Sequence, residues 1–397
     1  MKLPIATQRL GSSWKGLGRR TMADWRIATV FCFVTAAAGL GVGASEAAGQ
    51  DAAADPRIGS RVMIIRHGAP MRTPEATVWT SYLGEIFEVS LANGEWLWIE
   101  EKGGWLWEKE TVPYSTAIDD LSARLARNPS PENFHLRGVA FLAHEEYLRA
   151  VSDFDESLRR APRNSGALNN RGKAYYLLGD HRRAIRDFDA ALNVEPSNVM
   201  FLNNRALAHL EAGSSRSALK DLQSALLIVP DFTEALNNRG IVYMRSEDHS
   251  SALKDFNAAL KLDPKFVDAL GNRASALRKQ GRYSEAVLDL ENAIRISPGK
   301  FEAVNDLAWL LATCPDNSIR NTSRALTLAR QACDMTDYRQ WNTLDTLAAA
   351  LAGEGQFSEA ARHAAESVEM APRDERRRIR GHLDTITAGK PVREQLR

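Results

Sequence analysis

Asparagine side chains recur along this chain at a fixed spacing, and their amides could hydrogen-bond a ligand. One series is spaced by 34 residues and comprises Asn170, Asn204, Asn238 and Asn272. A second series precedes it by one residue and comprises Asn169, Asn203 and Asn237. Each amide offers two donors and an acceptor, so a row of them could hold the backbone of an extended peptide without reading its sequence. The same groups could equally hydrogen-bond neighbouring helices to one another, and the sequence leaves both interpretations open.

Arginine and aspartate follow the same spacing. Five arginines are each followed 16 residues later by an aspartate, in the pairs Arg137 and Asp153, Arg171 and Asp187, Arg205 and Asp221, Arg239 and Asp255, and Arg273 and Asp289. The planar guanidinium suits bidentate pairing with a carboxylate at a partly buried site. We therefore expect these residues to pair between two helices of each repeat. The alternative is a basic groove that binds acidic peptide tails.

No pattern in the sequence is typical of a catalytic, metal or cofactor site. The eight histidines are scattered, and there is no GxxxxGK[ST] loop, no His/Cys metal spacing and no Gly-x-Ser-x-Gly elbow. The net charge of +1 argues against a dedicated nucleic-acid-binding protein. We expect no catalytic residues, no metal, no cofactor and no nucleic-acid partner. Cys314 and Cys333 could be buried thiols or form a disulfide, and both alternatives stay open.

The 34-residue spacing itself predicts pairs of packed helices. Proline closes each period, at Pro162, Pro196, Pro230, Pro264 and Pro298. Alanine recurs 12 residues before each proline, at Ala150, Ala184, Ala218, Ala252 and Ala286. Small residues let two helices approach closely, and proline ends a helix because it lacks an N–H and clashes with the preceding turn. This period and pattern resemble the tetratricopeptide repeat.

The resemblance implies a mainly α-helical fold, a tetratricopeptide α-solenoid of about seven helix-turn-helix units over residues 131–372. The units are expected at residues 131–164, 165–198, 199–232, 233–266, 267–300, 301–340 and 341–372. The sixth holds a five-residue insertion near Cys314, and residues 373–397 are expected to form a capping helix and tail. In proteins of this kind the first helix of each unit lines a concave groove, where asparagines at these positions bind peptides. Seven stacked units suit a long groove rather than an enzyme.

The N-terminal segment resembles a secretory leader. Residues 27–45 carry no charge, three arginines precede them, and Ser45-Glu46-Ala47 offers a small-x-small cleavage site. Residues 1–47 are therefore expected to be a signal peptide, or alternatively an uncleaved inner-membrane anchor through residues 27–45. An exported, periplasmic or cell-envelope location follows. Residues 48–57 are rich in alanine and aspartate and are expected to be a linker.

Residues 58–113 predict a small all-β domain, followed by a linker or helix at residues 114–130. Short β-prone runs occupy residues 62–66, 76–80, 85–91, 95–100 and 104–108, and Asn93-Gly94 is a strong hairpin signal. The tryptophans alternate in two of these runs and are Trp96, Trp98, Trp105 and Trp107. Alternation sends each pair to one face of its strand, where the rings could cover the core or form a ligand platform.

The turn followed by tryptophan, and the Gly-Trp pair after it, resemble bacterial SH3-like domains. The resemblance implies a five-stranded barrel, and some members of that family bind peptidoglycan or peptides. The tryptophans named above would then form the ligand face. This adds an alternative function, a cell-wall adaptor that binds peptidoglycan through the small domain.

Residues 64–68, Ile-Ile-Arg-His-Gly, resemble the Arg-His-Gly motif of the histidine phosphatases. That fold needs a large parallel sheet and a second active-site histidine, and no histidine occurs between His67 and Val112. A five-stranded barrel cannot supply the rest of such a site, so an exposed turn is the better interpretation. The sequence as a whole favours a non-enzymatic scaffold of the bacterial cell envelope that binds a protein or an extended peptide.

Overall fold

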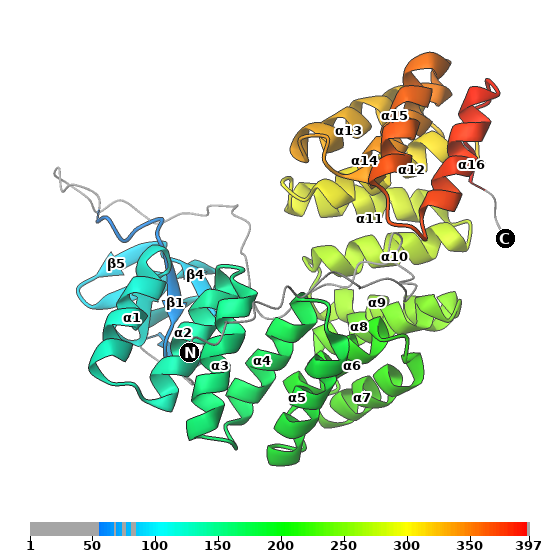
Figure 1. Cartoon of the computed structure of the whole chain (residues 1–397). Coiled ribbons are helices and arrows are strands. Elements are labelled where there is room, and N and C mark those ends of the chain that lie inside the picture. Colours follow the sequence, from blue (N-terminus) through cyan, green and yellow to red (C-terminus); the bar gives the residue numbers. More distant parts are fainter. Residues whose placement is uncertain (1–54, 67–68, 74–76, 81–84, 395–397) are drawn as a thin grey trace, which may run out of the picture. The chain divides into compact units, whose positions relative to one another are not determined.

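The computed structural model describes residues 55–66, 69–73, 77–80 and 85–394 (Figure 1). The leader expected over residues 1–47, nearly all of the linker at 48–57, and His67 lie outside the described residues. The described residues divide at Pro298 into two compact units.

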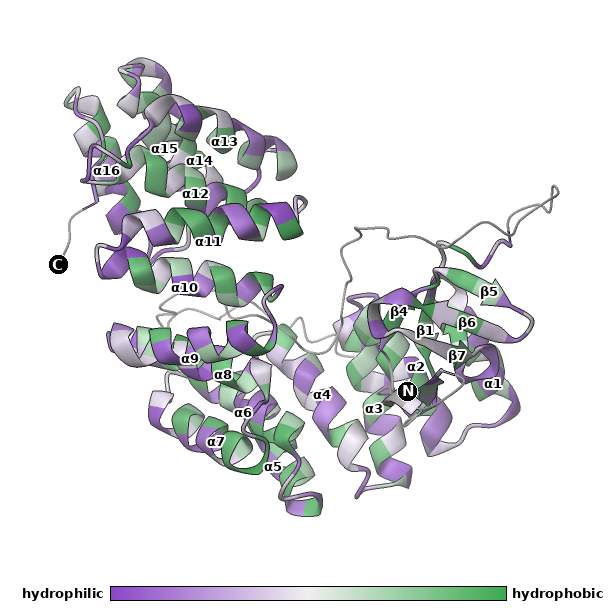
Figure 2. Ribbon diagram, turned by 180° about the vertical axis from the view of Figure 1, so that it is seen from behind, coloured by the Kyte–Doolittle hydropathy of each residue, from purple (hydrophilic) through white to green (hydrophobic). Residues whose placement is uncertain are grey.

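Helices dominate the described part of the chain, which confirms the expected mainly α fold. The first unit contains α1 (Ala117–Arg127), α2 (Pro131–Ala143), α3 (Tyr147–Arg160), α4 (Ser165–Leu177), α5 (His181–Val194), α6 (Val199–Glu211), α7 (Ser215–Ile228), α8 (Thr233–Arg245), α9 (His249–Leu262), α10 (Val267–Lys279) and α11 (Tyr283–Ile296). From α2 onward, two helices fall within each 34-residue period. We call them the first and the second helix of a repeat. Each carries both hydrophobic and hydrophilic residues along its length (Figure 2).

Glycine and phenylalanine set the closest approach of the two helices in three repeats. A Cβ added at Gly172 would lie 2.7 Å from the Phe188 ring, and the same conflict arises between Gly138 and Phe154 and between Gly240 and Phe256. The third and fifth repeats hold alanine and leucine at these two positions instead. The first helix therefore gains a methyl group only where the second helix loses a ring, because the interior is close-packed.

The turn between the two helices holds a left-handed residue in each of the first five repeats. Gly213 takes this position in the third repeat with φ 78°, and Glu247 takes it in the fourth with φ 59°. Glycine adopts this conformation without the steric cost that a side chain brings. The turn therefore tolerates glutamate, at some strain.

In the described part of the chain, eight short strands precede the helices and form two antiparallel sheets. The strands are β1 (Arg61–Ile64), β2 (Pro70–Arg72), β3 (Thr77–Thr80), β4 (Ile86–Glu88), β5 (Leu91–Asn93), β6 (Trp96–Ile99), β7 (Gly104–Trp107) and β8 (Thr111–Pro113). One sheet has the order β4-β1-β8 and the other has the order β3-β2-β7-β6-β5. The predicted Asn93-Gly94 hairpin joins β5 to β6, with Asn93 opposite Trp96.

A closed five-stranded barrel was expected here, and that expectation is wrong. Among the described strands no pairing joins the two sheets, so each keeps open edges. The runs recognised in the sequence miss β2 and β8 and place β5 within loop residues, because three-residue strands leave little periodicity. Strand β8 pairs with β1 in one sheet, and β2 pairs with β3 and β7 in the other, so the region forms two sheets.

Strand β1 separates two hydrophobic cores. Val62 and Ile64 point into the core between the sheets, together with Phe87, Leu97 and Leu106. Met63 points the other way, into a core shared with Leu121 of α1 and with buried residues of α2 and α3. The β region and the first repeat therefore share a core, and α1 (117–127) bridges them within the segment expected as a linker or helix.

The second unit continues the helical pairs. It contains α12 (Phe301–Thr313), α13 (Thr322–Met335), α14 (Trp341–Gly353), α15 (Phe357–Met370) and α16 (Arg376–Thr387). The long connection between α12 and α13 holds the insertion expected near Cys314. Helix α16 buries Ile379 and Ile386, which agrees with the expected capping helix. Cys314 and Cys333 are free and buried, so the disulfide alternative is not formed in this structure.

No helix in the described part of the chain is both long enough and apolar enough to cross a membrane.

Candidate functional site

The asparagine series form a hydrogen-bond ladder between successive first helices. Asn204 donates to Asn169 over 2.9 Å, Asn238 to Asn203 over 2.8 Å, and Asn272 to Asn237 over 3.0 Å. Each bond therefore joins the later series in one repeat to the earlier series in the repeat before it. The first repeat has His135 in place of the earlier asparagine. Asn170 Nδ2 lies 3.0 Å from Nε2 of this histidine. The inter-helix pairing that the sequence left open is present in the structure.

The ladder is shielded from solvent. Asn203 and Asn237 are 0% exposed, the remaining members except Asn170 are buried, and Asn170 is partly exposed. Asn203 Nδ2 and Asn204 Oδ1 are buried without a hydrogen-bond partner. A buried amide that is already paired cannot reach a peptide laid across the helices. Ligand contact by these asparagines stays a prediction, and their burial favours the structural alternative.

The arginine and aspartate series pair within each repeat, as the sequence predicted. Arg171 Nε and Nη2 both donate to the Asp187 carboxylate over 2.7 Å, and the other four pairs have the same bidentate form at 2.6–2.8 Å. The aspartate raises the pKa of Arg171, mainly through this hydrogen bond. A bidentate guanidinium fixes the first helix against the second, so this ladder is structural.

The remaining guanidinium nitrogen of this ladder links one repeat to the repeat before it. Arg171 Nη1 donates to Asp155 over 2.6 Å and Arg205 Nη1 to Asp189 over 2.8 Å. In the fifth repeat the acceptor is an amide, because Arg273 Nη1 donates to Asn257 Oδ1 over 2.8 Å. The junction of the fourth and fifth repeats therefore differs chemically from the first two junctions, and the third junction also has an amide at this position, Gln223.

A polar cluster joins first helices near their C-terminal ends. Arg245 donates to Glu211 over 2.9 Å and to the Leu210 carbonyl over 2.8 Å. Burial raises the pKa of Glu211 more than the charge of Arg245 lowers it. Burial and the charge of Glu211 raise the pKa of Tyr176 on α4. This cluster is partly desolvated and only partly exposed, so its charges interact strongly with any group that approaches them.

Four tryptophans of the small domain, Trp96, Trp98, Trp105 and Trp107, lie together on one face of the five-stranded sheet. Trp96 lies opposite Trp107, and Trp98 lies opposite Trp105. The Trp98 and Trp105 rings meet edge to face with centroids 5.3 Å apart. Leu97, Ile99 and Leu106 alternate with them and fill the core.

The tryptophan face is the outer face of that sheet. Trp96 is 39% exposed, Leu91 beside Trp98 is 53% exposed, and the Lys109 ammonium lies 5.0 Å from the centre of the Trp107 ring. The sequence left core packing open as a role of the tryptophans. In the structure Leu97, Ile99 and Leu106 pack in the core instead. The structure places the four tryptophans of the predicted ligand face side by side. That they bind a ligand stays a prediction.

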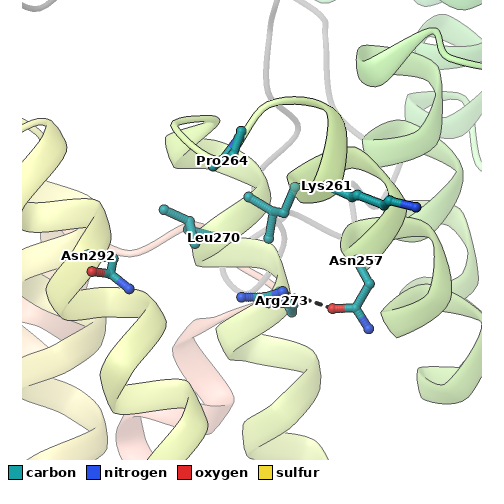
Figure 3. Close-up of a pocket in the computed structure, with 7 residues that line it drawn as sticks. Asn257, Lys261, Pro264, Leu270, Arg273 and Asn292 are labelled. Atoms are coloured by element: carbon teal, nitrogen blue, oxygen red, sulfur yellow. Dashed lines mark hydrogen bonds between the residues drawn. The ribbon is translucent and has the colours of Figure 1, made fainter.

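A polar pocket opens at the junction of the fourth and fifth repeats (Figure 3). Its volume is about 370 Å³, and its lining includes Asn257, Lys261, Arg273 and Asn292. Leu260 and Leu270 are buried and form its apolar wall. No sequence pattern pointed to this pocket, because amides stand at both residue 223 and residue 257 of the series that begins with Asp155 and Asp189.

Among the described residues no group of three or more His, Cys, Asp or Glu side chains is placed to hold a metal ion. His67, the centre of the phosphatase-like motif, lies outside the described residues. The Arg66 side chain forms an ion pair with Glu110, which is buried.

Comparison with known proteins identifies the helical class. The profile described as Tetratricopeptide repeat matches residues 135–181 and 237–301, and a second profile of the same description matches residues 166–198. No curated protein matches the chain. The chain therefore contains tetratricopeptide repeats, and its helical part has the tetratricopeptide α-solenoid fold.

Solved structures share this fold at low sequence identity. The crystal structure of the APC/C hetero-tetramer Cut9-Hcn1 is 20% identical with a TM-score of 0.53, over 60% of this chain and 46% of that chain. A tetratricopeptide repeat protein from Parabacteroides merdae is 21% identical with a TM-score of 0.52, over 66% of this chain and 100% of that chain. Yeast Tom70 is 15% identical with a TM-score of 0.51, over 69% of this chain and 59% of that chain. The chain thus spans less than half of the Cut9-Hcn1 chain, and these likenesses concern the fold alone.

Proposed function

We propose that this chain is a non-enzymatic scaffold of the cell envelope that binds a protein or an extended peptide along the first helices of its repeats. The observation that carries the proposal is the double ladder of asparagine and Arg–Asp pairs, which holds successive helices in a fixed register. A rigid array presents side chains at regular intervals and avoids the entropy cost of ordering them on binding. Tetratricopeptide repeats typically serve as protein-interaction scaffolds, which supports the same function.

Partner contact falls to the polar cluster rather than to the asparagines. The asparagine amides are almost all buried and mostly paired with one another, whereas the side chains of Glu211 and Arg245 are partly exposed at the ends of first helices. A charged group of the partner could pair with either member of the Glu211–Arg245 bridge. Such a charge pair contributes more binding free energy at a partly desolvated site than on an open surface.

Affinity capture tests this proposal. The full chain and a Glu211→Ala/Arg245→Ala variant are used in parallel to capture proteins from envelope extract, with quantitation by mass spectrometry. The variant removes equal and opposite charges, so its net charge is unchanged. We expect a partner enriched by the parent chain and lost by the folded variant. Equal enrichment of every captured protein would refute binding at the first helices.

The variant needs a matched control, because Arg245 also bonds the Leu210 carbonyl. An Arg282→Ala/Glu285→Ala variant removes an ion pair of 2.6 Å on the surface of α11. It has the same charge balance and is expected to capture the partner as well as the parent chain does. Circular dichroism and urea unfolding establish that both variants keep the helical fold.

A second candidate function rests on the outward tryptophans. We infer that the β region is an SH3-like module whose tryptophan face binds peptidoglycan. Four indole rings gathered on the outer face of a sheet are costly to leave in water, and such exposed apolar patches mark binding sites. The edge-to-face pair and the adjacent Lys109 offer both stacking and a charge to a glycan or a stem peptide.

Sedimentation with purified peptidoglycan tests the second function. Deleting the β region is unsuitable, because it shares a core with α1–α3. A Trp96→Ala/Trp107→Ala variant of the full chain keeps that core. We expect the parent chain and a Leu148→Ala control, which removes a 74% exposed leucine of α3, to sediment. Sedimentation of the tryptophan variant to the same extent would exclude this face as the glycan site.

The envelope location is part of the proposal and rests on the uncharged stretch at residues 27–45. Intact-mass measurement of the protein recovered from cells distinguishes the two alternatives. Loss of the first 47 residues indicates a cleaved leader, and recovery of the full mass in the membrane fraction indicates an anchor. Full mass in the soluble cytoplasmic fraction would contradict both.

A further inference from the structure

In the second repeat an arginine is held between an aromatic ring and an acid, at the turn from α4 to α5. The guanidinium carbon of Arg183 lies 4.5 Å from the centre of the Tyr175 ring, and its Nε donates to Oδ2 of Asp180 over 2.6 Å. A ring face and a carboxylate together suit a guanidinium, which can stack on one and donate to the other. In the first repeat the corresponding distances are 4.0 Å and 2.6 Å, and the three residues are Phe141, Glu146 and Arg149.

The fourth repeat keeps the ring and the acid but lacks the arginine. Tyr243 and Asp248 lie two periods after the ring and the acid of the second repeat, and Ser251 takes the place of Arg183. In the described part of the chain no cation lies over the Tyr243 ring, which is partly exposed. Asp248 is exposed, whereas Asp180, covered by its arginine, is only partly exposed. Among the five repeats that keep the 34-residue period this combination occurs only in the fourth, since the third lacks the acid and the fifth lacks the ring.

The turns of the second and fourth repeats place the ring and the acid in the same way. The Asp248 N–H donates to the Tyr243 carbonyl over 2.9 Å, and the Asp180 N–H donates to the Tyr175 carbonyl over the same distance. Oδ1 of each acid accepts the backbone N–H three residues later, over 2.9 Å in the second repeat and 3.0 Å in the fourth. Oδ2 of Asp248 therefore corresponds to the oxygen that meets Arg183 in the second repeat.

A neighbouring lysine does not replace the missing arginine. Lys254 interacts electrostatically with Asp248, as Arg186 at the equivalent position does with Asp180. In the second repeat Arg186 leaves the ring to Arg183. The hydrogen bonds that Asp248 accepts lower its pKa, so the carboxylate is ionised at neutral pH. The fourth repeat therefore presents an aromatic face and a negative charge to a group from outside the chain.

We propose that Tyr243 and Asp248 bind an arginine side chain of the protein partner. Its guanidinium stacks on the Tyr243 ring and donates to Oδ2 of Asp248, as Arg183 does within the second repeat. Arginine suits this site better than lysine, because a planar fork can stack on a ring and donate in its own plane at once. The proposal rests on the proposed function, since Tyr243 lies on the first helix α8, and it identifies the partner as a chain with an exposed arginine.

The test is a titration of the full chain with a blocked pentapeptide that carries a central arginine between alanines. Binding is observed through the Tyr243 ring signals by NMR, with labelled tyrosine. The comparison peptide carries citrulline, which has nearly the same shape and no charge. We expect saturable shifts with the arginine peptide and roughly tenfold weaker binding of the citrulline peptide, because the ionic hydrogen bond and the cation over the ring are both lost.

Ser251→Arg is the decisive variant, because it recreates the arrangement of the second repeat and fills the site from within the chain. It preserves the fold and is expected to weaken binding of the arginine peptide by roughly tenfold or more. Ser250→Arg is the matched control, since it adds the same charge one residue earlier, where the second repeat has Arg182. This control is expected to bind within about twofold of the parent chain. Arg183→Ser should create a second site, observed as new saturable shifts of the Tyr175 ring.

Three results of the titration would overturn the proposal: no saturable shifts with the arginine peptide, equal affinity for the citrulline peptide, or unchanged affinity in Ser251→Arg. The proposal also predicts that Ser251→Arg loses the partner captured from envelope extract. If Ser251→Arg retains a partner that the Glu211→Ala/Arg245→Ala variant loses, the arginine site is wrong and binding along the first helices stands.

Discussion

Asn238 donates its side-chain amide to Oδ1 of Asn203 over 2.8 Å, and the two residues are 1% and 0% exposed. They belong to successive repeats, so the bond fixes the distance between two first helices. The first prediction concerns its energetic weight. Asn238→Ala leaves the Asn203 acceptor buried without its donor and should lower the free energy of unfolding by about 1–3 kcal/mol.

Urea unfolding of both single variants and the double variant measures this coupling. The Asn203→Ala/Asn238→Ala variant should lose less than the sum of the single losses, because each single change already breaks the shared bond. Strict additivity would mean that the two amides act independently, and the ladder would then have no structural role.

A second prediction concerns the paired sizes at the contact of first and second helices. Gly172→Ala places a methyl group against the Phe188 ring and should cost about 1–3 kcal/mol of stability through overpacking. Adding Phe188→Leu gives the alanine–leucine combination of the third repeat, Ala206 and Leu222. The double variant should recover part of the loss in thermal and urea unfolding. A double variant less stable than Gly172→Ala would contradict the size relationship.

A third prediction distinguishes the two faces of strand β6. Leu97→Ala empties the core between the sheets and should cost about 2–5 kcal/mol. Trp96→Ala, one residue earlier, removes a larger side chain that faces outward and should cost under about 1 kcal/mol. Urea unfolding followed by tryptophan fluorescence compares them. A larger loss at Trp96 than at Leu97 would reverse the assignment of the faces.

A fourth prediction uses the pKa of Glu211, which burial raises above the usual 4.5. The folded chain then holds a proton that the unfolded chain has released, so this group contributes less stability as the pH rises from 4.5 toward its folded pKa, and nothing changes above that value. Glu211→Gln abolishes this contribution.

The variant should therefore gain stability relative to the parent chain as the pH rises through that window. Urea unfolding of both proteins at a series of pH values measures the difference. A difference that stays constant with pH, or one that changes in the opposite direction, would contradict the raised pKa.

The sequence predicts the helical pairs and the Arg–Asp contacts well, because both follow from residues within one 34-residue period. The role of Asn203 and Asn237 was open, because their burial depends on the packing of neighbouring repeats. The alternation of Trp96 with Leu97 indicated two faces and could not say which one is buried, because both sets are apolar. Barrel closure failed as a prediction since it depends on long-range strand pairing. The pocket at Asn257 was missed because its lining comes from α9, α10 and α11, and the space between these helices depends on their packing.

Site-specific photocrosslinking tests the central claim, that a protein partner binds along the first helices. A photoreactive phenylalanine derivative replaces Met200 on the first helix α6 in one full-length protein and Leu227 on the second helix α7, which is 85% exposed, in another. Both are irradiated with envelope extract. The account predicts a discrete crosslinked protein from position 200 and none of the same mass from position 227. The same crosslink from position 227, with none from position 200, would contradict it.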